Sequence, residues 1–343
     1  MLEQSALFRR LPERIMINPD ALNRLTESVR SALGPTICAA LDDPTVVEIM
    51  VNPDGRVYIE RMGSSADYAG TMAAENSELV IGAVAHLLSS VVTTARPIIS
   101  GKLPIGGHRF EGLIPPAVAR AAFTIRKRAP FAISLARYVE QAIMTDRQAE
   151  ILRGAIRARQ NIVVAGGTGS GKTTLCNALL GELVALAPHD RLVILEDTPE
   201  IQSAAENHVC LNTTDTVDMS QLLKTTLRLR PDRIIVGEVR DGAALTLLKA
   251  WNTGHPGGVT TLHANSARTA LIRLEQLVAE VSVQTMRSVI GEAVDLVIAI
   301  ERAPEGRRVS EIIEVQGAAS GQFDTRTLSH TPSPQSRRSD HAA

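Results

Sequence analysis

The segment GGTGSGKT, residues 166–173, constrains the fold more than any other part of this 343-residue chain. It fits the pattern G-x-x-x-x-G-K-[ST], in which successive backbone N–H groups point at bound phosphates. An apolar run typical of a strand (residues 162–165) precedes it, and a run typical of a helix (residues 174–186) follows it. This strand–loop–helix context argues against a plain Gly/Ser turn. It predicts a phosphate-binding loop in a parallel α/β sheet.

The loop and the helix start predict the residues that hold ATP. Lys172 is expected to reach the β- and γ-phosphates, and the Thr173 hydroxyl to bind Mg²⁺. The N-terminus of the helix adds a partial positive charge that favours anions. The expected nucleotide-binding residues are Gly166, Gly167, Thr168, Gly169, Ser170, Gly171, Lys172, Thr173 and Thr174.

Before this segment the chain has a mixed α+β pattern. Residues 22–41 carry apolar positions at helical spacing, broken at Gly34-Pro35, and residues 75–92 read as a second helix. VVEIMVNPDGRVYIER predicts a β-hairpin around its Asn-Pro-Asp-Gly turn, and HRFEGLIPP and AAFTIRK predict further strands. We expect an N-terminal α+β domain at residues 1–130 and a linker with one short helical segment at residues 131–146.

After the loop, apolar strand runs alternate with helical runs, as in RLVILED, DRIIVGE and GGVTTLH. This alternation predicts an α/β domain over residues 147–316. The remaining residues, 317–343, are rich in Ser, Thr, Arg and Pro, so we expect them to be disordered.

Composition limits the classes of partner. The net charge is -1 and aromatic residues make up 3%, so direct nucleic-acid binding is not expected. Three isolated cysteines do not make a four-thiolate zinc site, and we expect their thiols to be reduced.

The N-terminal stretch lacks the apolar region of a signal peptide. The longest weakly polar run has 14 residues, whereas a membrane span needs about 20. We therefore expect a cytoplasmic protein with no transmembrane segment, attached peripherally to any membrane complex.

Acidic residues follow two of the expected strands. Glu196, Asp197 and Glu200 come after the first, and Glu238 comes after the second. The carboxyl ends of parallel strands are where ligands gather, so these side chains are placed to reach Mg²⁺ or an attacking water. Glu238 is the strongest of the four, and only one or two of the others need be functional. His263 follows a further strand run, where it either approaches the γ-phosphate or bonds a neighbouring strand.

Four motifs, in order, resemble those of the type II/IV secretion ATPases, the hexameric traffic ATPases of secretion, pilus and conjugation machines. These are GGTGSGKTT, VILEDTPEI, RPDRIIVGEVR and TGHPGGVTTLHAN, between about residues 160 and 270. LKAWNTGHPGG and the short N-terminal region look most like the TrbB conjugal-transfer branch. The resemblance implies a RecA-like P-loop domain preceded by a smaller α+β domain, with ATP in the cleft between them and a homo-hexameric ring.

The resemblance also implies roles for individual residues. Glu238 would activate the water, Glu200 would assist near Mg²⁺, and His263 would contact the γ-phosphate. Arg109 and Arg126 match the arginines that clamp phosphates across the domain cleft, a task suited to the forked guanidinium. Arg120, Arg128 and Arg240 are rivals for that role.

Two departures from the family pattern are visible. Asp241 follows Arg240, the arginine that ends the motif RPDRIIVGEVR, at a position where the family often has Glu. The four-cysteine metal site of many large members is ruled out, because the chain has three isolated cysteines. The leading hypothesis is a motor of conjugative type IV secretion that works with inner-membrane components. The alternatives are a pilus assembly or retraction ATPase, a nucleotide-gated assembly scaffold with little turnover, and a nucleic-acid motor.

Overall fold

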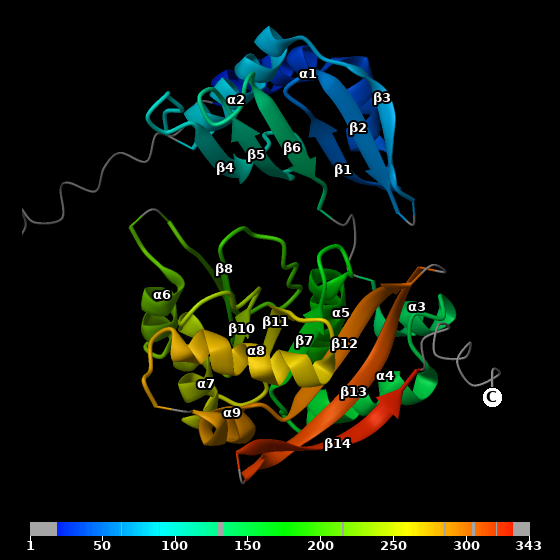
Figure 1. The fold of residues 1–343 in the computed structure, drawn as a ribbon, viewed down its shortest axis with the longest axis vertical. Coiled ribbons are helices and arrows are strands. Elements are labelled where there is room, and N and C mark those ends of the chain that lie inside the picture. The colour runs from blue at the N-terminus through cyan, green and yellow to red at the C-terminus, as the bar shows by residue number, and fades with distance from the viewer. Residues whose placement is uncertain are drawn as a thin grey trace, which may run out of the picture. The chain divides into compact units, whose positions relative to one another are not determined.

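The chain divides into two compact units, Met1–Pro130 and Phe131–Ala343 (Figure 1). The computed structural model describes residues 19–331, apart from 63, 89, 129–132, 215, 285, 304–305 and 320. The N-terminal stretch that lacks a signal-peptide pattern lies outside the described residues. No helix in the described part of the chain is long and apolar enough to cross a membrane.

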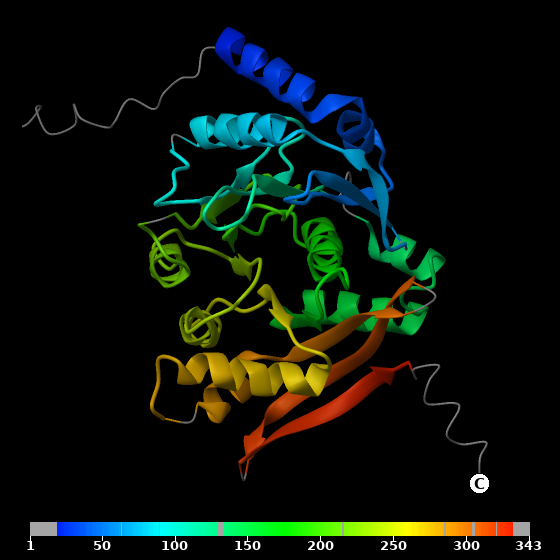
Figure 2. The same cartoon turned by 45° about the horizontal axis from the view of Figure 1, so that its top comes forward.

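The first unit packs two helices on a six-stranded antiparallel sheet of order β3-β2-β1-β6-β5-β4. Figure 2 shows the helices above the sheet. The predicted hairpin is β1 and β2, and the predicted strands near the end of the unit include β5 and β6. The elements are α1 (Pro19–Asp42), β1 (Val46–Val51), β2 (Arg56–Arg61), β3 (Ala66–Thr71), α2 (Ala74–Leu87), β4 (Ile98–Lys102), β5 (Arg109–Leu113) and β6 (Ala122–Arg126).

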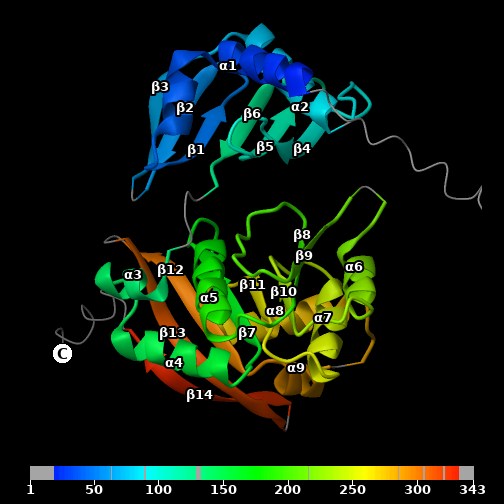
Figure 3. The ribbon, with the colours of Figure 1, turned by 180° about the vertical axis from the view of Figure 1, so that it is seen from behind.

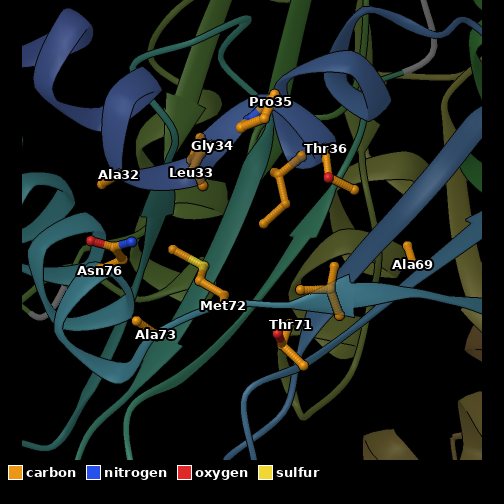
Figure 4. A pocket seen from close by; sticks show the side chains of 12 residues that line it. Ala32, Leu33, Gly34, Pro35, Thr36, Ala69, Thr71, Met72, Ala73 and Asn76 are labelled. Atoms are coloured by element: carbon orange, nitrogen blue, oxygen red, sulfur yellow. The ribbon is translucent and has the colours of Figure 1, made fainter.

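The break expected in the first helix is a kink in α1. Gly34 has φ 72° and ψ 173°, outside the helical region, and Pro35 removes a backbone donor there. A hollow of about 140 Å³ lies at this kink, between α1, the end of β3 and the start of α2. Figure 4 shows Gly34 and Pro35 on one side and Met72 and Asn76 on the other. None of the predicted site residues lines this hollow.

The second unit is built on an eight-stranded sheet of order β14-β13-β12-β7-β11-β10-β8-β9. The six strands from β12 to β9 in this order run parallel, and β13 and β14 add antiparallel strands at one edge. The strands are β7 (Ile162–Gly166), β8 (Leu192–Glu196), β9 (His208–Asn212), β10 (Arg233–Val236), β11 (Val259–His263), β12 (Leu296–Ala303), β13 (Gly306–Ala319) and β14 (Gln322–His330).

Helices cover both faces of this sheet, and its central strands β7, β8 and β10 are therefore buried along their whole length. Val164 faces a core formed with α3, α4 and α5, whereas Val163 faces a core formed with α6 to α9. Figures 1 and 3 show these two layers from opposite sides. The helices are α3 (Leu135–Glu140), α4 (Asp146–Arg157), α5 (Lys172–Leu186), α6 (Met219–Thr226), α7 (Ala243–Asn252), α8 (Ala267–Ala279) and α9 (Arg287–Ala293). The predicted fold class, an α/β RecA-like P-loop domain after a smaller α+β domain, is confirmed.

The segment predicted as a linker, residues 131–146, is folded into the second unit over its described part. Leu135 and Tyr138 on α3 are 0% and 2% exposed in the core with α4 and α5. Thr145 caps α4 through a reciprocal capping box with Gln148. The prediction of a linker was wrong there because α3 contributes apolar side chains that only tertiary packing buries.

The prediction of a disordered tail from residue 317 is also wrong for its described part. Residues 317–319 end β13, and β14 runs along it, with pairs such as Ile313 and Thr327. The backbone ladder orders this polar strand, helped by the partly buried Phe323 and Leu328. Residues 332–343 of the predicted tail lie outside the described residues.

Candidate active site

The phosphate loop joins the buried strand β7 to α5. A Cβ at Gly166 would lie 2.4 Å from both the Ile300 carbonyl oxygen and Ser170 Oγ, so no larger side chain fits there. Gly171 immediately before α5 has φ 99°, a left-handed conformation that favours glycine. The loop thus requires glycine at the positions that the sequence pattern marks. Of the other predicted residues, Thr168 and Gly169 are exposed, and Gly167, Thr173 and Thr174 are partly exposed.

Lys172 begins α5 and is only 8% exposed. Its Nζ donates to the Gly167 carbonyl oxygen at 2.9 Å, and it lies 3.4 Å from each ring nitrogen of His263. One turn further along α5, Cys176 is fully buried in the core. Burial raises the pKa of its thiol to about 12. This cysteine is therefore an unreactive packing residue beside the loop.

The strand order brings His263 and Glu238 to the same edge as the loop. His263 ends β11 and pairs in register with Gly166 on the neighbouring strand β7. Glu238 follows β10, which pairs with β11 on its other side. Since these strands are parallel, their carboxyl ends meet at one edge of the sheet. The expected grouping of Lys172, His263 and Glu238 is present in the structure.

Glu238 lies between a histidine and an arginine. Its Oε1 is 3.0 Å from His263 Nε2, and its Oε2 accepts from Arg240 Nε at 2.9 Å and from an Arg240 terminal amino group at 2.7 Å. Arg240 also lies 3.6 Å from Asp197. Burial lowers the pKa of the Arg240 guanidinium, but the hydrogen bond to Glu238 and the nearby carboxylates outweigh it, and the pKa is raised overall. The contacts with Arg240 and His263 therefore hold the Glu238 carboxylate in a fixed orientation.

The carboxylates at the end of β8 and in the turn after it have different surroundings. Glu196 is 4% exposed, and its Oε1 accepts the backbone N–H groups of Glu200 and Ile201, each at 2.8 Å. Glu196 therefore shapes the turn that carries Glu200. A Cβ at Gly237 would lie 3.0 Å from Glu196 Cγ, so glycine before Glu238 leaves room for this capping carboxylate.

A residue that the sequence analysis missed holds the same turn from α5. Asn177 is 3% exposed, accepts the Gln202 N–H at 3.0 Å and donates to the Glu200 carbonyl oxygen at 3.4 Å. Its signal was present in the sequence, since it is a lone amide within the apolar run LCNALL. A buried polar side chain needs such partners.

Arg109 and Arg126 belong to the first unit, on β5 and β6. They pair directly in register, and Lys102 on β4 pairs with Arg109 on its other side. Arg126 lies 3.5 Å from Glu48 of β1, its register partner there. We name this row of Lys102, Arg109 and Arg126 the cation row.

The rival arginines have other surroundings. Arg120 lines a second hollow in the first unit, next to Ala121. The Arg128 N–H donates to His108 Nδ1 at 3.2 Å. Burial, together with the charges of Lys127 and Arg128, lowers the pKa of His108 to about 4, so its ring is neutral near pH 7. Arg240, the third rival, belongs to the second unit, where it pairs with Glu238.

Comparison with known proteins identifies the family. The sequence profile of the type II/IV secretion system proteins matches residues 33–319. The chain is 63% identical to the conjugal transfer protein TrbB of Rhizobium radiobacter over 302 residues, which cover 88% of this chain and 94% of that protein. It is 34% identical to a type IV secretion system protein PtlH homolog of Bordetella bronchiseptica over 307 residues, covering 78% and 89%.

Among solved structures, the fold is similar to that of the ATPase DotB of Yersinia pseudotuberculosis, with a TM-score of 0.59 and 17% identity over 83% of this chain and 78% of that one. The resemblance to the secretion ATPases, read from the four motifs, is confirmed. The chain belongs to the type II/IV secretion system protein family, and it is an ATPase.

Proposed function

We propose that this chain is the ATP-hydrolysing motor of conjugative DNA transfer through a type IV secretion machine. The observation that carries the proposal is the 63% identity to a conjugal transfer protein over nearly the whole of both chains. The motor acts as a homo-hexamer in the cytoplasm, peripheral to the inner membrane, with the inner-membrane components of the machine as its partners.

The phosphate loop supplies the binding half of the proposed site. The backbone N–H groups of residues 166–174 surround the phosphates, and Lys172 exchanges its contact with the Gly167 carbonyl oxygen for phosphate oxygens. Two side chains would offer oxygen ligands to Mg²⁺: the Thr173 hydroxyl and the Glu200 carboxylate. Oxygen ligands suit this hard cation. Among the described residues, no group of three or more His, Cys, Asp or Glu side chains is placed to hold a metal ion by itself. When bound, Mg²⁺ neutralises charge on the phosphates.

Glu238 is the proposed base for the attacking water. His263 and Arg240 hold both of its carboxylate oxygens, so the side chain is oriented before ATP arrives. His263 lies between Glu238 and Lys172. From this position its ring would contact the γ-phosphate of ATP and lose that contact when the phosphate leaves. Glu200, on the turn shaped by Glu196, assists near the metal and water.

Arg109 and Arg126 are the proposed phosphate clamp from the first unit. Like charges directly opposite each other on neighbouring strands destabilise a sheet, and the cation row places three of them side by side. Glu48 contacts the row at one end. A phosphate chain is an anion that relieves this repulsion, and paired guanidinium groups bind it in a forked geometry.

The clamp is tested with Arg109→Gln and Arg126→Gln. We expect weaker ATP binding and slower hydrolysis in both, because each removes one phosphate donor. Arg56→Gln is the matched control: it makes the same charge change on the same sheet, at an arginine whose side chain is 60% exposed and pairs with Asp54. Equal effects of all three substitutions would contradict the clamp and indicate a general effect of charge.

Plasmid transfer tests the function as a whole. In a donor strain that lacks its own copy of this gene, the wild-type chain is expected to restore transfer to recipient cells, and Glu238→Gln is not. Restored transfer by an inactive variant would make the chain a scaffold. Normal transfer in the deletion strain, with pilus extension or retraction lost, would instead identify a pilus motor.

A further inference from the structure

The outer side of the phosphate loop contacts a residue of the β12–β13 hairpin. Arg307 Nε donates to the Gly169 carbonyl oxygen at 3.4 Å. Its Cδ lies 3.0 Å from the position of a Cβ on Gly171, so the side chain covers the glycine that ends the loop. The strand pairing explains this placement: β12 pairs with β7, and β13 returns antiparallel beside it, with Arg302 opposite Arg307.

The start of β13 is held firmly just beyond Arg307. Val309 is 1% exposed, its N–H donates to the Ile143 carbonyl oxygen at 2.7 Å, and its own carbonyl oxygen accepts from Gln148 Nε2 at 3.2 Å. These bonds fix the strand against α4 and the segment before it. Figure 3 shows α3 and α4 beside β13. Arg307 is therefore carried to the loop by a rigid support.

Arg307 has donors to spare. A guanidinium group has five N–H donors, and the contact with Gly169 uses one of them. Within the described part of the second unit, no carboxylate lies within ion-pair distance of Arg307. The neighbouring Arg308, in contrast, is paired with Glu301 at 2.6 Å. A cation that is fixed against a phosphate loop and has no carboxylate partner among the described residues is suited to an anionic ligand.

The strand order separates Arg307 from the residues proposed for hydrolysis. His263 and Glu238 come from β11 and β10 on one side of β7, whereas β12 and β13 lie on its other side. A group that approaches from this second side contacts the phosphate chain away from the proposed base.

We propose that Arg307 is a nucleotide-binding residue. This proposal rests on the ATP site proposed above. Its Nε donates to the Gly169 carbonyl oxygen, and the N–H of the same peptide, on Ser170, donates within the loop to the Gly167 carbonyl oxygen at 3.4 Å. Its terminal amino groups bind the phosphates that ATP and ADP share. The residue contributes affinity for both nucleotides and does not take part in the cleavage.

The test measures nucleotide affinity and turnover separately on the full-length protein. Arg307→Gln is expected to weaken binding of both a fluorescent ADP analogue and the matching ATP analogue by about tenfold or more, the effect of losing a hydrogen bond to a charged group. The turnover number at saturating ATP stays near that of the wild type, so the loss appears in KM. Arg307→Lys keeps the charge without the fork and is expected to bind with intermediate affinity.

Arg326→Gln is the control, because it makes the same charge change on β14 at an exposed arginine paired with Glu314 at 2.8 Å. Unchanged binding in Arg307→Gln would overturn the inference, and so would an unchanged affinity with a fallen turnover number. If Arg307→Gln is too unstable to assay, Arg307→Lys decides: affinity equal to that of the wild type overturns the inference, and reduced affinity for both nucleotides supports it. A wild-type chain that binds neither analogue would refute the proposed ATP site itself.

Discussion

Glu238→Gln provides the sharpest test of the catalytic arrangement. The substitution keeps the size of the side chain but removes its charge and its ability to accept a proton. An amide oxygen can still accept one of the hydrogen bonds, whereas the amide nitrogen faces a partner that donates. If Glu238 is the base, the turnover number falls by about 10²- to 10⁴-fold, the usual contribution of general acid–base catalysis.

The structure predicts a much smaller effect on folding. The Arg240 side chain that pairs with Glu238 is 51% exposed, and Glu238 itself is 16% exposed. An ion pair with so much solvent access contributes about 1 kcal/mol or less. In a unit of this size that corresponds to about 2–4 °C in Tm. Activity and stability should therefore respond very differently to the same substitution.

Phosphate release at saturating ATP and thermal unfolding give these two quantities. Asp197→Asn is the matched control, since Asp197 also faces Arg240, at 3.6 Å, and the charge change is identical. The control should retain most of the turnover number. A Glu238→Gln enzyme with more than a tenth of the wild-type turnover would refute the assignment, as would an equal loss in Asp197→Asn.

Three further predictions concern groups that are buried or partly buried. Lys172→Ala should abolish phosphate release while circular dichroism shows an intact fold; turnover at the wild-type rate would contradict the phosphate-loop assignment. Glu196→Ala leaves two backbone N–H groups without their acceptor, so the free energy of unfolding should fall by about 2 kcal/mol or more; an unchanged melting curve would rule out the capping role. Burial raises the pKa of Asp190, but the hydrogen bond and charge of Arg233, together with Arg159, outweigh it and lower the pKa overall. The stability from this pair is therefore present above the ordinary aspartate pKa of about 4 and lost as pH falls through the lowered value. Asp190→Asn should lower the Tm at pH 7 and flatten its decline in acid, and equal acid profiles of the two proteins would exclude this linkage.

Much of the fold was predictable because its signals are local. The kink of α1 follows from a Gly-Pro pair, the β1–β2 hairpin from its turn residues, and β7, β8, β10 and β11 from apolar runs of strand length. Strand β3 was missed, since only Tyr68 and Thr71 in ADYAGT favour strands and its residues are largely exposed. Strand β14 was missed because its residues QFDTRTLSH are mostly polar, and its order comes from backbone pairing with β13.

The amino-acid sequence by itself determined the phosphate loop and its Lys172, because the glycines and the strand–loop–helix context lie within 25 consecutive residues. It also determined the family to which the chain belongs, because four motifs follow one another in order between about residues 160 and 270. Only the tertiary structure decided what each carboxylate does. Glu196 and Glu238 both follow a strand in the sequence, yet Glu196 caps a turn and Glu238 faces His263 and Arg240. The contact of Arg307 with the loop was likewise invisible, since 138 positions separate it from Gly169. Strand order brings such residues together, and no local pattern of side chains specifies which strand lies beside which.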